Sequence, residues 1–451
     1  MVKSSHILPL VLAAAWLFAG CNPEPQPTPQ ELEPVPANVP LQGFYKDIFI
    51  DGGIALTSRT TLPIVPYLGL TMEYFASCSS VDDMSALDTL IQTNVFSQND
   101  QDENGCLLYP DGAPRFRMIY VNGGKSGAHG FSLNTKGNKG LKRIREFYAK
   151  GGSYVGTCAG AYMSSCGSGT TTNPNYLGIW PGYSHPTSLN DTYTDMKVEP
   201  GSALLNYYDF GGDGRVAHVR HNGGCYMSSA APRGTEVLLR YYCPDTTKVH
   251  MQGSIWAFKK DSLTGRVVDC GSHPEGVESG EQRDLMAAMC RYAMDGGGIS
   301  RAKAELENGV VREMTALYSA GDSSHARIGD LQYHHFAIYL PEGVKTLTVS
   351  TQGAEGSAGC NLELYLKKGT FAYPDVATHS ATAEGCAQTL TVTAPEAGLW
   401  MAAVRCPDTV TATLETYDNG NGKTGRYYRY SGNVTPLNGV PYTVCATWNK
   451  K

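Results

Sequence analysis

One cysteine, Cys158, stands in the sequence GTCAG at residues 156–160, directly after a short apolar stretch. This is the pattern of a nucleophile elbow, in which a strand turns sharply into a helix and a glycine lies two residues before and two residues after the nucleophile. Such a turn presents the thiol at a helix N-terminus, where the partial positive charge favours the thiolate. The N–H of Ala159 would then point toward a developing oxyanion. A buried structural thiol in a glycine-rich turn fits the same residues.

A general base for this cysteine is offered by the sequence His273-Pro274-Glu275. Proline biases the residue before it toward extended backbone, so the side chains of His273 and Glu275 are expected to project to the same side. One ring nitrogen of His273 can then take the thiol proton while Glu275 orients the other nitrogen. Three residues are a weak pattern alone, and their place between a predicted strand and a predicted helix strengthens it.

Two glycine-rich strand ends are expected to border the same cleft. Gly123 and Gly124 end the stretch RFRMIYVNGG, where a glycine pair lets the backbone approach a substrate carbonyl and supply a second oxyanion N–H. Two turn glycines without a chemical role fit equally well. Asn222, Gly223 and Gly224 end the stretch RVAHVRHNGG, and such ends gather at the cleft of a parallel sheet.

Two histidines in that stretch, His218 and His221, raise the question of a metal site. On a strand, residues three apart face opposite sides of the sheet. A structural role or a place in the substrate cleft is therefore favoured over zinc. We expect neither a metal nor a cofactor.

Positioning these groups requires strands whose carboxyl ends meet at one edge. From about residue 43 to residue 300, short apolar strands alternate with helical stretches, which predicts a doubly wound, mostly parallel α/β sheet of the flavodoxin-like kind. A domain over residues 43–325 follows from this pattern. The predicted helices, marked by helical spacing or by glycine stops, cover residues 62–76, 138–152, 279–298 and, as a charged stretch, 300–320.

The order of these motifs resembles the class I glutamine amidotransferase-like superfamily, most of all its biotin-protein ligase N-terminal domain branch. The resemblance rests on a strand ending in NGG, then GGSYVGTCAGAY, then a strand followed by HPE. It implies a doubly wound parallel sheet and a Cys-His-Glu triad, carried here by Cys158, His273 and Glu275. Neither a synthase domain nor a biotin-ligase catalytic domain accompanies the motifs, so the resemblance implies acyl chemistry at a carbonyl and not the parent reactions.

Beyond residue 325 the apolar pattern changes to period two, which predicts a small all-β sandwich over residues 326–451. The stretches FAIYLPEGVKTLTVSTQG, NLELYLKKG and APEAGLWMAAVRC resemble the pre-peptidase C-terminal domain of secreted bacterial hydrolases. That resemblance implies an accessory role with a glycan or protein ligand. NLELYL stands where the family often has an Asp-rich version, so no metal role follows.

The N-terminus predicts export. In residues 1–21, an apolar run precedes Ala-Gly-Cys and resembles a lipoprotein signal peptide in which Cys21 is lipidated, although Phe18 stands where leucine is usual. Residues 22–42 form a proline-rich linker suited to holding a domain off a membrane. Ordinary secretion is the alternative. We expect a protein of the bacterial cell envelope, lipid-anchored on its periplasmic or surface face.

Composition supports the same compartment and excludes one class of partner. A net charge of -6 without a Lys/Arg-rich block gives no footprint for nucleic acid. The 13 cysteines fit an oxidising space. Four of them fall in the C-terminal part and are candidates for two disulfides: Cys360, Cys386, Cys406 and Cys445.

These features predict an exported, lipid-anchored cysteine hydrolase that cleaves a small-molecule or peptide amide through a thioester acyl-enzyme. A peptide, a γ-glutamyl amide, a cell-wall amide and an ester all satisfy this chemistry. The alternative is a non-catalytic, surface-anchored binding protein that uses the same fold as a scaffold. The hydrolase requires a hyper-reactive Cys158 that depends on His273, whereas the scaffold requires only ordinary thiol reactivity.

Overall fold

The computed structural model describes residues 46–51, 62–75, 107–124, 140–228, 230–317, 323–418 and 424–450. All of these residues belong to one compact unit of residues 34–451. The predicted signal peptide, the lipidation site Cys21 and the proline-rich linker lie outside the described residues. Within the described ranges, no helix combines the length and the apolar character needed to cross a membrane.

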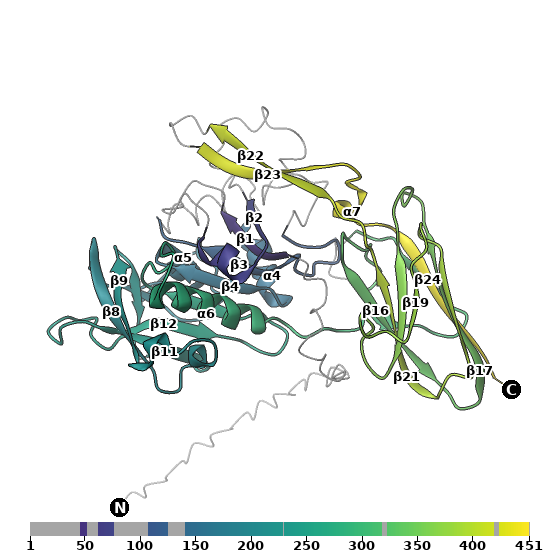
Figure 1. Ribbon diagram of the computed structural model, residues 1–451, viewed down its shortest axis with the longest axis horizontal. Coiled ribbons are helices and arrows are strands. Elements are labelled where there is room, and N and C mark those ends of the chain that lie inside the picture. Colours follow the sequence, from purple (N-terminus) through teal and green to yellow (C-terminus); the bar gives the residue numbers. More distant parts are fainter. Residues whose placement is uncertain are drawn as a thin grey trace, which may run out of the picture. The chain divides into compact units, whose positions relative to one another are not determined.

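Parallel strands form one half of the first sheet, in the order β2, β1, β3, β4, β13, of which Figure 1 labels the first four. Val121 of β3 pairs with Gly156 of β4, and Cys270 of β13 pairs with Thr157 of β4. The carboxyl ends of β3, β4 and β13 therefore lie side by side. The bounds of the strands, in sheet order, are Met72–Phe75, Lys46–Asp51, Phe116–Val121, Ser153–Thr157 and Val267–Cys270.

The other half of this sheet is antiparallel, so the expectation of a mostly parallel sheet is wrong. The segment 259–266 joins β12 to β13 without a helix, and such a short link permits only antiparallel pairing. The sheet is mixed as a result. Its main antiparallel strands are β7 (Ser184–Pro186), β8 (Thr192–Val198), β9 (Arg215–His221), β10 (Cys225–Met227), β11 (Thr235–Tyr242) and β12 (Gly253–Phe258), and two short strands, β5 (Gly167–Ser168) and β6 (Thr171–Thr172), extend its edge.

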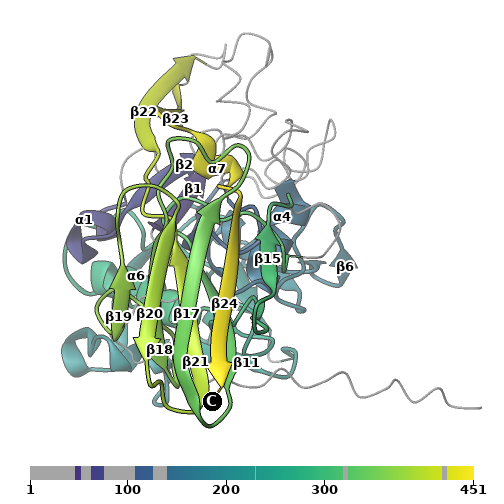
Figure 2. The ribbon, with the colours of Figure 1, turned by 90° about the vertical axis from the view of Figure 1, so that its right-hand side faces the viewer.

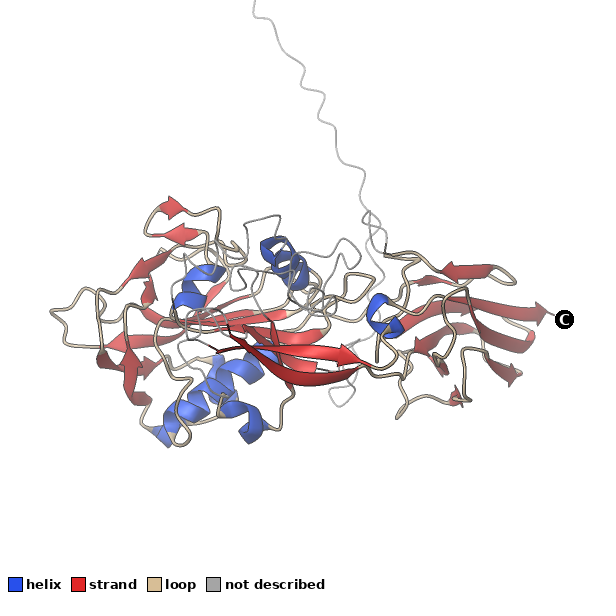
Figure 3. Cartoon of the chain, turned by 90° about the horizontal axis from the view of Figure 1, so that it is seen from above, coloured by secondary structure: helices blue, strands red, loops and turns tan. Residues whose placement is uncertain are grey.

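Helices cover both faces of the parallel half (Figure 3). α4 (Gly140–Ala149) and α5 (Ala159–Ser164) pack into one core, and α6 (Glu281–Asp295) and α1 (Ile64–Leu68) pack into the other. The helices predicted over 138–152 and 279–298 are thus confirmed. The helix predicted over 62–76 is wrong beyond α1, because the next residue, a glycine, adopts a left-handed φ of 65° and the chain continues as β2.

The C-terminal part contains two sheets that share one core (Figure 2), as the period-two pattern predicted. Phe336 and Trp400 of one sheet and Leu347 and Val444 of the other belong to this core. One sheet comprises β14 (Ala304–Glu305), β16 (Tyr333–Leu340), β21 (Gly398–Arg405), β18 (Glu363–Lys368) and β19 (His379–Ala381), and the other β15 (Val311–Met314), β24 (Tyr442–Lys450), β17 (Val344–Gly353) and β20 (Gln388–Thr393).

The structure corrects one expectation for this region, a helix, and adds a hairpin that the sequence did not suggest. The helix predicted over 300–320 is wrong, because β14 and β15 pair with strands of the two sheets and tertiary pairing overrides local helical propensity. The C-terminal sheets therefore begin at Ala304. A hairpin of β22 (Thr411–Asp418) and β23 (Thr424–Ser431) forms a separate sheet that the sequence did not suggest.

The disulfides expected in the C-terminal part are absent, since all four cysteines there are free thiols. Three of them, Cys360, Cys386 and Cys406, lie in the shared core, whereas Cys445 lies on β24 and is half-buried. All ten cysteines in the described ranges are free.

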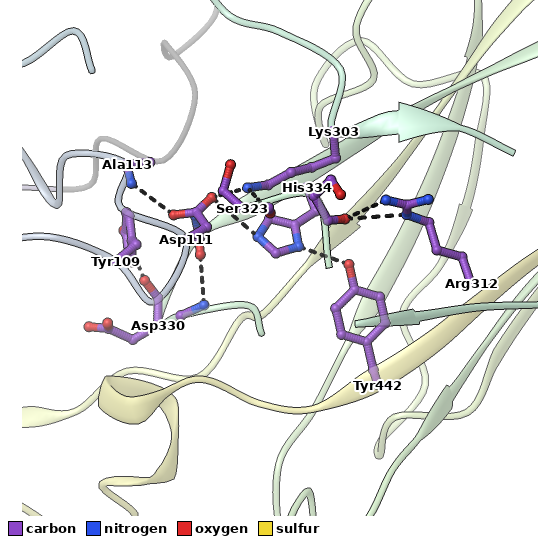
Figure 4. Close-up of polar contacts among 12 residues, drawn as sticks. Tyr109, Asp111, Ala113, Lys303, Arg312, Ser323, Asp330, His334 and Tyr442 are labelled. Atoms are coloured by element: carbon purple, nitrogen blue, oxygen red, sulfur yellow. Dashed lines mark hydrogen bonds and ion pairs between the residues drawn. The ribbon is translucent and has the colours of Figure 1, made fainter. Parts of the chain in front are cut away.

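Buried charges join the segment before β3 to the C-terminal sheets (Figure 4). Asp111 pairs with the Lys303 ammonium and accepts a hydrogen bond of 2.9 Å from the Ala113 N–H. His334 Nε2 lies 3.6 Å from Asp111 Oδ2, and its Nδ1 lies 2.9 Å from the Tyr442 hydroxyl. Burial alone would raise the pKa of Asp111, but Lys303 and His334 hold it well below its usual range. This carboxylate is therefore charged and paired.

Candidate active site

The backbone at Cys158 has the geometry of a nucleophile elbow. Cys158 lies between β4 and α5 with φ 50° and ψ -105°, a conformation that non-glycine residues rarely adopt. A Cβ atom at Gly160 would overlap the carbonyl oxygen of Val121, and one at Gly156 would lie 2.6 Å from the carbonyl carbon of Gly160. The two glycines of GTCAG are therefore required by close backbone packing.

The three segments that carry the predicted chemistry meet because their strands are neighbours in the sheet. The N–H of Cys158 donates to the Cys270 carbonyl at the end of β13 over 2.8 Å. His273 follows β13 directly, and Gly123 and Gly124 follow β3 on the other side of β4. The parallel half of the sheet thus brings the nucleophile, the base and the glycine pair to one edge.

The structure brings Cys158, His273 and Glu275 together. His273 Nδ1 lies 2.9 Å from Glu275 Oε1, and the His273 ring also hydrogen-bonds the Cys158 side chain. The side chain of His273 is 13% exposed and that of Glu275 is 4% exposed. His273 therefore sits between a sulfur atom and a buried carboxylate, with one ring nitrogen directed to each.

Electrostatics favour a positively charged ring in this arrangement. Burial alone would lower the pKa of His273, but the hydrogen bonds with Cys158 and Glu275 and the charge of Glu275 raise it to about 10. The ring is therefore an imidazolium at neutral pH. A cation in contact with sulfur stabilises negative charge on it, which is the environment of a reactive cysteine.

Of the remaining predicted residues, Asn222 contacts the sulfur, and the others lie on the segments around it. The Asn222 carbonyl oxygen lies 3.7 Å from Cys158 Sγ, so Asn222 faces the thiol with an acceptor. The Gly223 N–H donates to the Leu189 carbonyl over 2.7 Å. Ala159 is the first residue of α5, where N–H groups have no helical acceptor. Of the glycine pair, Gly123 is buried, and Gly124 is half-buried with a φ of 152°. Their oxyanion roles stay predictions.

Two other thiols lie beside the elbow but in a different environment. Cys225 Sγ lies 4.0 Å from the Cys158 carbonyl oxygen, and Cys270 supplies the carbonyl that holds the Cys158 N–H. Both side chains are fully buried, and burial raises the pKa of Cys225 and of Cys270. They are neutral thiols at neutral pH, so neither is a candidate nucleophile.

Sequence reasoning gave His221 a structural role or a place in the cleft, but it missed the polar residues behind the site that the ring contacts. His221 is buried and contacts the hydroxyls of Thr187 and Ser272, and Tyr162 donates its hydroxyl to the Gly224 carbonyl over 3.2 Å. His218, in contrast, is exposed, so the two histidines of β9 face different surroundings, as their spacing predicted. Only the position of Ser272 next to His273 could have signalled this layer.

Comparisons with known proteins give weak similarities. No protein-family model and no curated protein matches the chain. A glutamine amidotransferase structure aligns with 55% of this chain and 98% of its own, at 15% identity and a TM-score of 0.36. A putative GMP synthase protein from Thermoplasma acidophilum covers 55% of this chain and 94% of its own, at 11% identity and a TM-score of 0.33. The pre-peptidase C-terminal domain of Bacillus anthracis collagenase covers 33% of this chain and 98% of its own, at 10% identity and a TM-score of 0.18.

Proposed function

We propose that this protein is a cysteine hydrolase that cleaves an amide or peptide bond through a thioester acyl-enzyme. The observation that carries the proposal is the contact series Cys158, His273, Glu275 at a strained elbow. The motif order that resembles class I amidotransferase-like proteins supports the same chemistry. A small-molecule or peptide amide is the substrate class that fits.

The reaction follows from the charges of the three groups. The Cys158 sulfur attacks the substrate carbonyl, and the negative charge that develops on the carbonyl oxygen faces the Ala159 N–H. His273 then gives its proton to the leaving amine, which departs and leaves a thioester on Cys158. Neutral His273 next takes a proton from a water molecule, whose oxygen attacks the thioester carbonyl. The C–S bond breaks, the carboxylic acid leaves, and the Cys158 thiolate and the His273 imidazolium are restored. The balance is amide plus water to acid plus amine.

Glu275 has an electrostatic role in this cycle. Its carboxylate fixes the His273 ring and stabilises the imidazolium in each charged state. Burial of Glu275 at 4% exposure strengthens this interaction, since water does not screen it. The carboxylate itself exchanges no proton during the reaction.

The rest of the chain suggests where the hydrolase works. We propose that lipid on Cys21 anchors it in the bacterial cell envelope and that the C-terminal sheets serve as an accessory module that binds a glycan or protein. The resemblance to pre-peptidase C-terminal domains and the proline-rich linker support this arrangement. Labelling cells with a lipid precursor, in wild type and Cys21→Ala, tests the anchor directly.

The hydrolase is tested first without a substrate. Iodoacetamide alkylation of Cys158 is followed by peptide mass spectrometry in wild type and in His273→Ala, with half-buried Cys166 as the reference thiol in the same molecule. Faster alkylation of Cys158 than of Cys166, lost in His273→Ala, supports the proposal. Equal alkylation rates for Cys158 and Cys166, unchanged in His273→Ala, would support the scaffold function instead.

A panel of peptide amides, γ-glutamyl amides, cell-wall amides and esters then identifies the substrate. Each compound is screened for amine or alcohol release and for an acyl adduct on Cys158 by intact mass. Cys158→Ser and His273→Ala are the matched inactive variants. An adduct on another residue, or turnover that survives both substitutions, would contradict the proposed mechanism.

A further inference from the structure

We propose that His221 is a positioning residue that holds the His273 segment and the Asn222–Gly224 segment against Cys158. The inference rests on the proposed function, because it assigns the support of the same site. His221 ends β9 and is fully buried. Its Nε2 lies 2.7 Å from Thr187 Oγ1, and its Nδ1 lies 2.8 Å from Ser272 Oγ. One ring thus joins two segments that are distant in the sequence.

The hydroxyl of Thr187 fixes which ring nitrogen carries the proton. A hydroxyl has one donor and two acceptor positions. Thr187 Oγ1 donates to the Gly224 carbonyl over 3.0 Å and accepts the Leu189 N–H over 3.2 Å. The second acceptor position is left for His221, so His221 Nε2 donates and Nδ1 accepts the Ser272 hydroxyl. Every polar atom of this contact series is then satisfied.

A neutral ring is what this arrangement requires. Burial and the positive charge of His273 lower the pKa of His221 to about 4. The ring is therefore uncharged at neutral pH and can donate through one nitrogen while accepting through the other. Since the ring is buried, it acts on the site only through the groups that it holds.

Both hydrogen-bond partners of His221 hold segments that border the sulfur. The Gly224 carbonyl accepts the N–H and the hydroxyl of Thr187, each over 3.0 Å, and this fixes the segment whose Asn222 carbonyl lies 3.7 Å from Cys158 Sγ. Ser272 directly precedes His273, and the His273 N–H donates to the Arg220 carbonyl over 2.9 Å. Loss of the ring would therefore release both segments together.

The space around the ring leaves little room for an alternative position. A Cβ atom at Gly224 would lie 3.0 Å from His221 Cε1, so the ring packs flush against this glycine. The Ser272 hydroxyl also lies 3.4 Å from the Tyr241 hydroxyl, which donates to the Cys225 carbonyl over 2.7 Å. The Ser272 hydroxyl is therefore enclosed by the His221 ring and the Tyr241 hydroxyl, and its single proton goes to His221 Nδ1.

The experiment measures iodoacetamide alkylation of Cys158 in wild type, His221→Leu, His221→Gln and His273→Ala at pH 7, again with Cys166 as the reference. His221→Leu is expected to slow alkylation between about tenfold and about a hundredfold, the loss that a displacement of about 1 Å causes. His221→Gln is expected to restore most of the rate, because an amide supplies one donor and one acceptor. A role in stability alone would not produce this recovery of the rate.

The control is His335→Leu, which removes another fully buried histidine, hydrogen-bonded to the Ala372 carbonyl over 2.9 Å in the C-terminal part. It is expected to leave Cys158 alkylation unchanged. If His221→Leu does not fold, Thr187→Val removes one hydroxyl at nearly constant shape and is expected to slow alkylation as well.

The outcomes separate the two proposals. A wild-type rate in His221→Leu or Thr187→Val, with slow alkylation in His273→Ala, overturns the role of His221 and leaves the hydrolase intact. A wild-type rate in His273→Ala overturns both. If alkylation is slow in His221→Leu and equally slow in His221→Gln, the result also counts against positioning through these two hydrogen bonds.

Discussion

Replacing Glu275 with glutamine removes a buried negative charge from the site while keeping the shape of the side chain. Glu275 Oε1 lies 2.9 Å from His273 Nδ1. The pKa of His273 rises from 6.5 to about 10, against the effect of burial, because of hydrogen bonds with Cys158 and Glu275. A rise of this size corresponds to about 5 kcal/mol in favour of the imidazolium. The sulfur and the carboxylate share this stabilisation.

The expected effect follows from the change in hydrogen-bond type. A hydrogen bond to a charged group contributes about 1.5 to 3 kcal/mol, and one between neutral groups about 1 kcal/mol. Glu275→Gln should therefore weaken the support of the imidazolium by about 0.5 to 2 kcal/mol. Since about 1.4 kcal/mol corresponds to a factor of ten, the imidazolium–thiolate pair should lose a factor of about 2 to about 30 relative to the neutral pair. Cys158 should therefore be alkylated more slowly at pH 7, by up to that factor.

The assay is the rate of iodoacetamide alkylation of Cys158 between pH 5 and pH 10, measured by peptide mass spectrometry. In Glu275→Gln the pKa of His273 falls, so the loss of the imidazolium moves to lower pH. Glu278→Gln, three residues along the chain, removes the same charge from an exposed side chain and serves as the matched control. Equal rates and equal pH profiles in the two variants would refute the role of Glu275.

Three further predictions concern the elements that hold the site. Gly160→Ala forces a Cβ atom into the Val121 carbonyl oxygen, so it should lower the free energy of unfolding by about 1 to 3 kcal/mol in urea and slow Cys158 alkylation; an unchanged midpoint would contradict close packing at the elbow. Asp111→Asn leaves the Lys303 ammonium buried without its partner and should lower the free energy of unfolding by about 3 to 5 kcal/mol in the same assay. Because the pKa of Asp111 is lowered in the folded protein, the difference in unfolding free energy between wild type and variant should shrink as the pH falls through the acid range. Burial raises the pKa of Asp269 above 3.8, so as the pH rises the unfolded chain loses this proton before the folded chain does. Asp269→Asn should therefore raise the free energy of unfolding at pH 7 and leave it unchanged below about pH 4.

The sequence predicted the parts of the fold whose pattern is local. The helices over 138–152 and 279–298 were found because apolar spacing and glycine stops mark them. The stretch 300–320 was misread, because its strands are defined by pairing with β16 and β24 and not by their own composition. The antiparallel half of the first sheet escaped prediction for the same reason, since strand direction depends on partners elsewhere in the chain.

The candidate site divides in the same way. Cys158 was suggested by its own glycines, and His273 and Glu275 by the proline between them, so each group carries a local signal. His221 carries none that identifies its role, because its partner Thr187 lies 34 residues away and its partner Ser272 lies 51 residues away. Such a contact series forms only when three strand ends are folded together.

The antiparallel half of the sheet supplies the walls of the site. In a sheet of parallel strands alone, the neighbours of Cys158 would be only the residues that follow β3 and β13. The strands β9 and β10 add the Asn222 carbonyl, 3.7 Å from the sulfur, and the Arg220 carbonyl that accepts the His273 N–H. The proposed catalytic groups thus come from the parallel half, and the groups that border and hold them come from the antiparallel half. Substitutions in β9 should therefore change the reactivity of Cys158 without altering any of the three proposed catalytic residues.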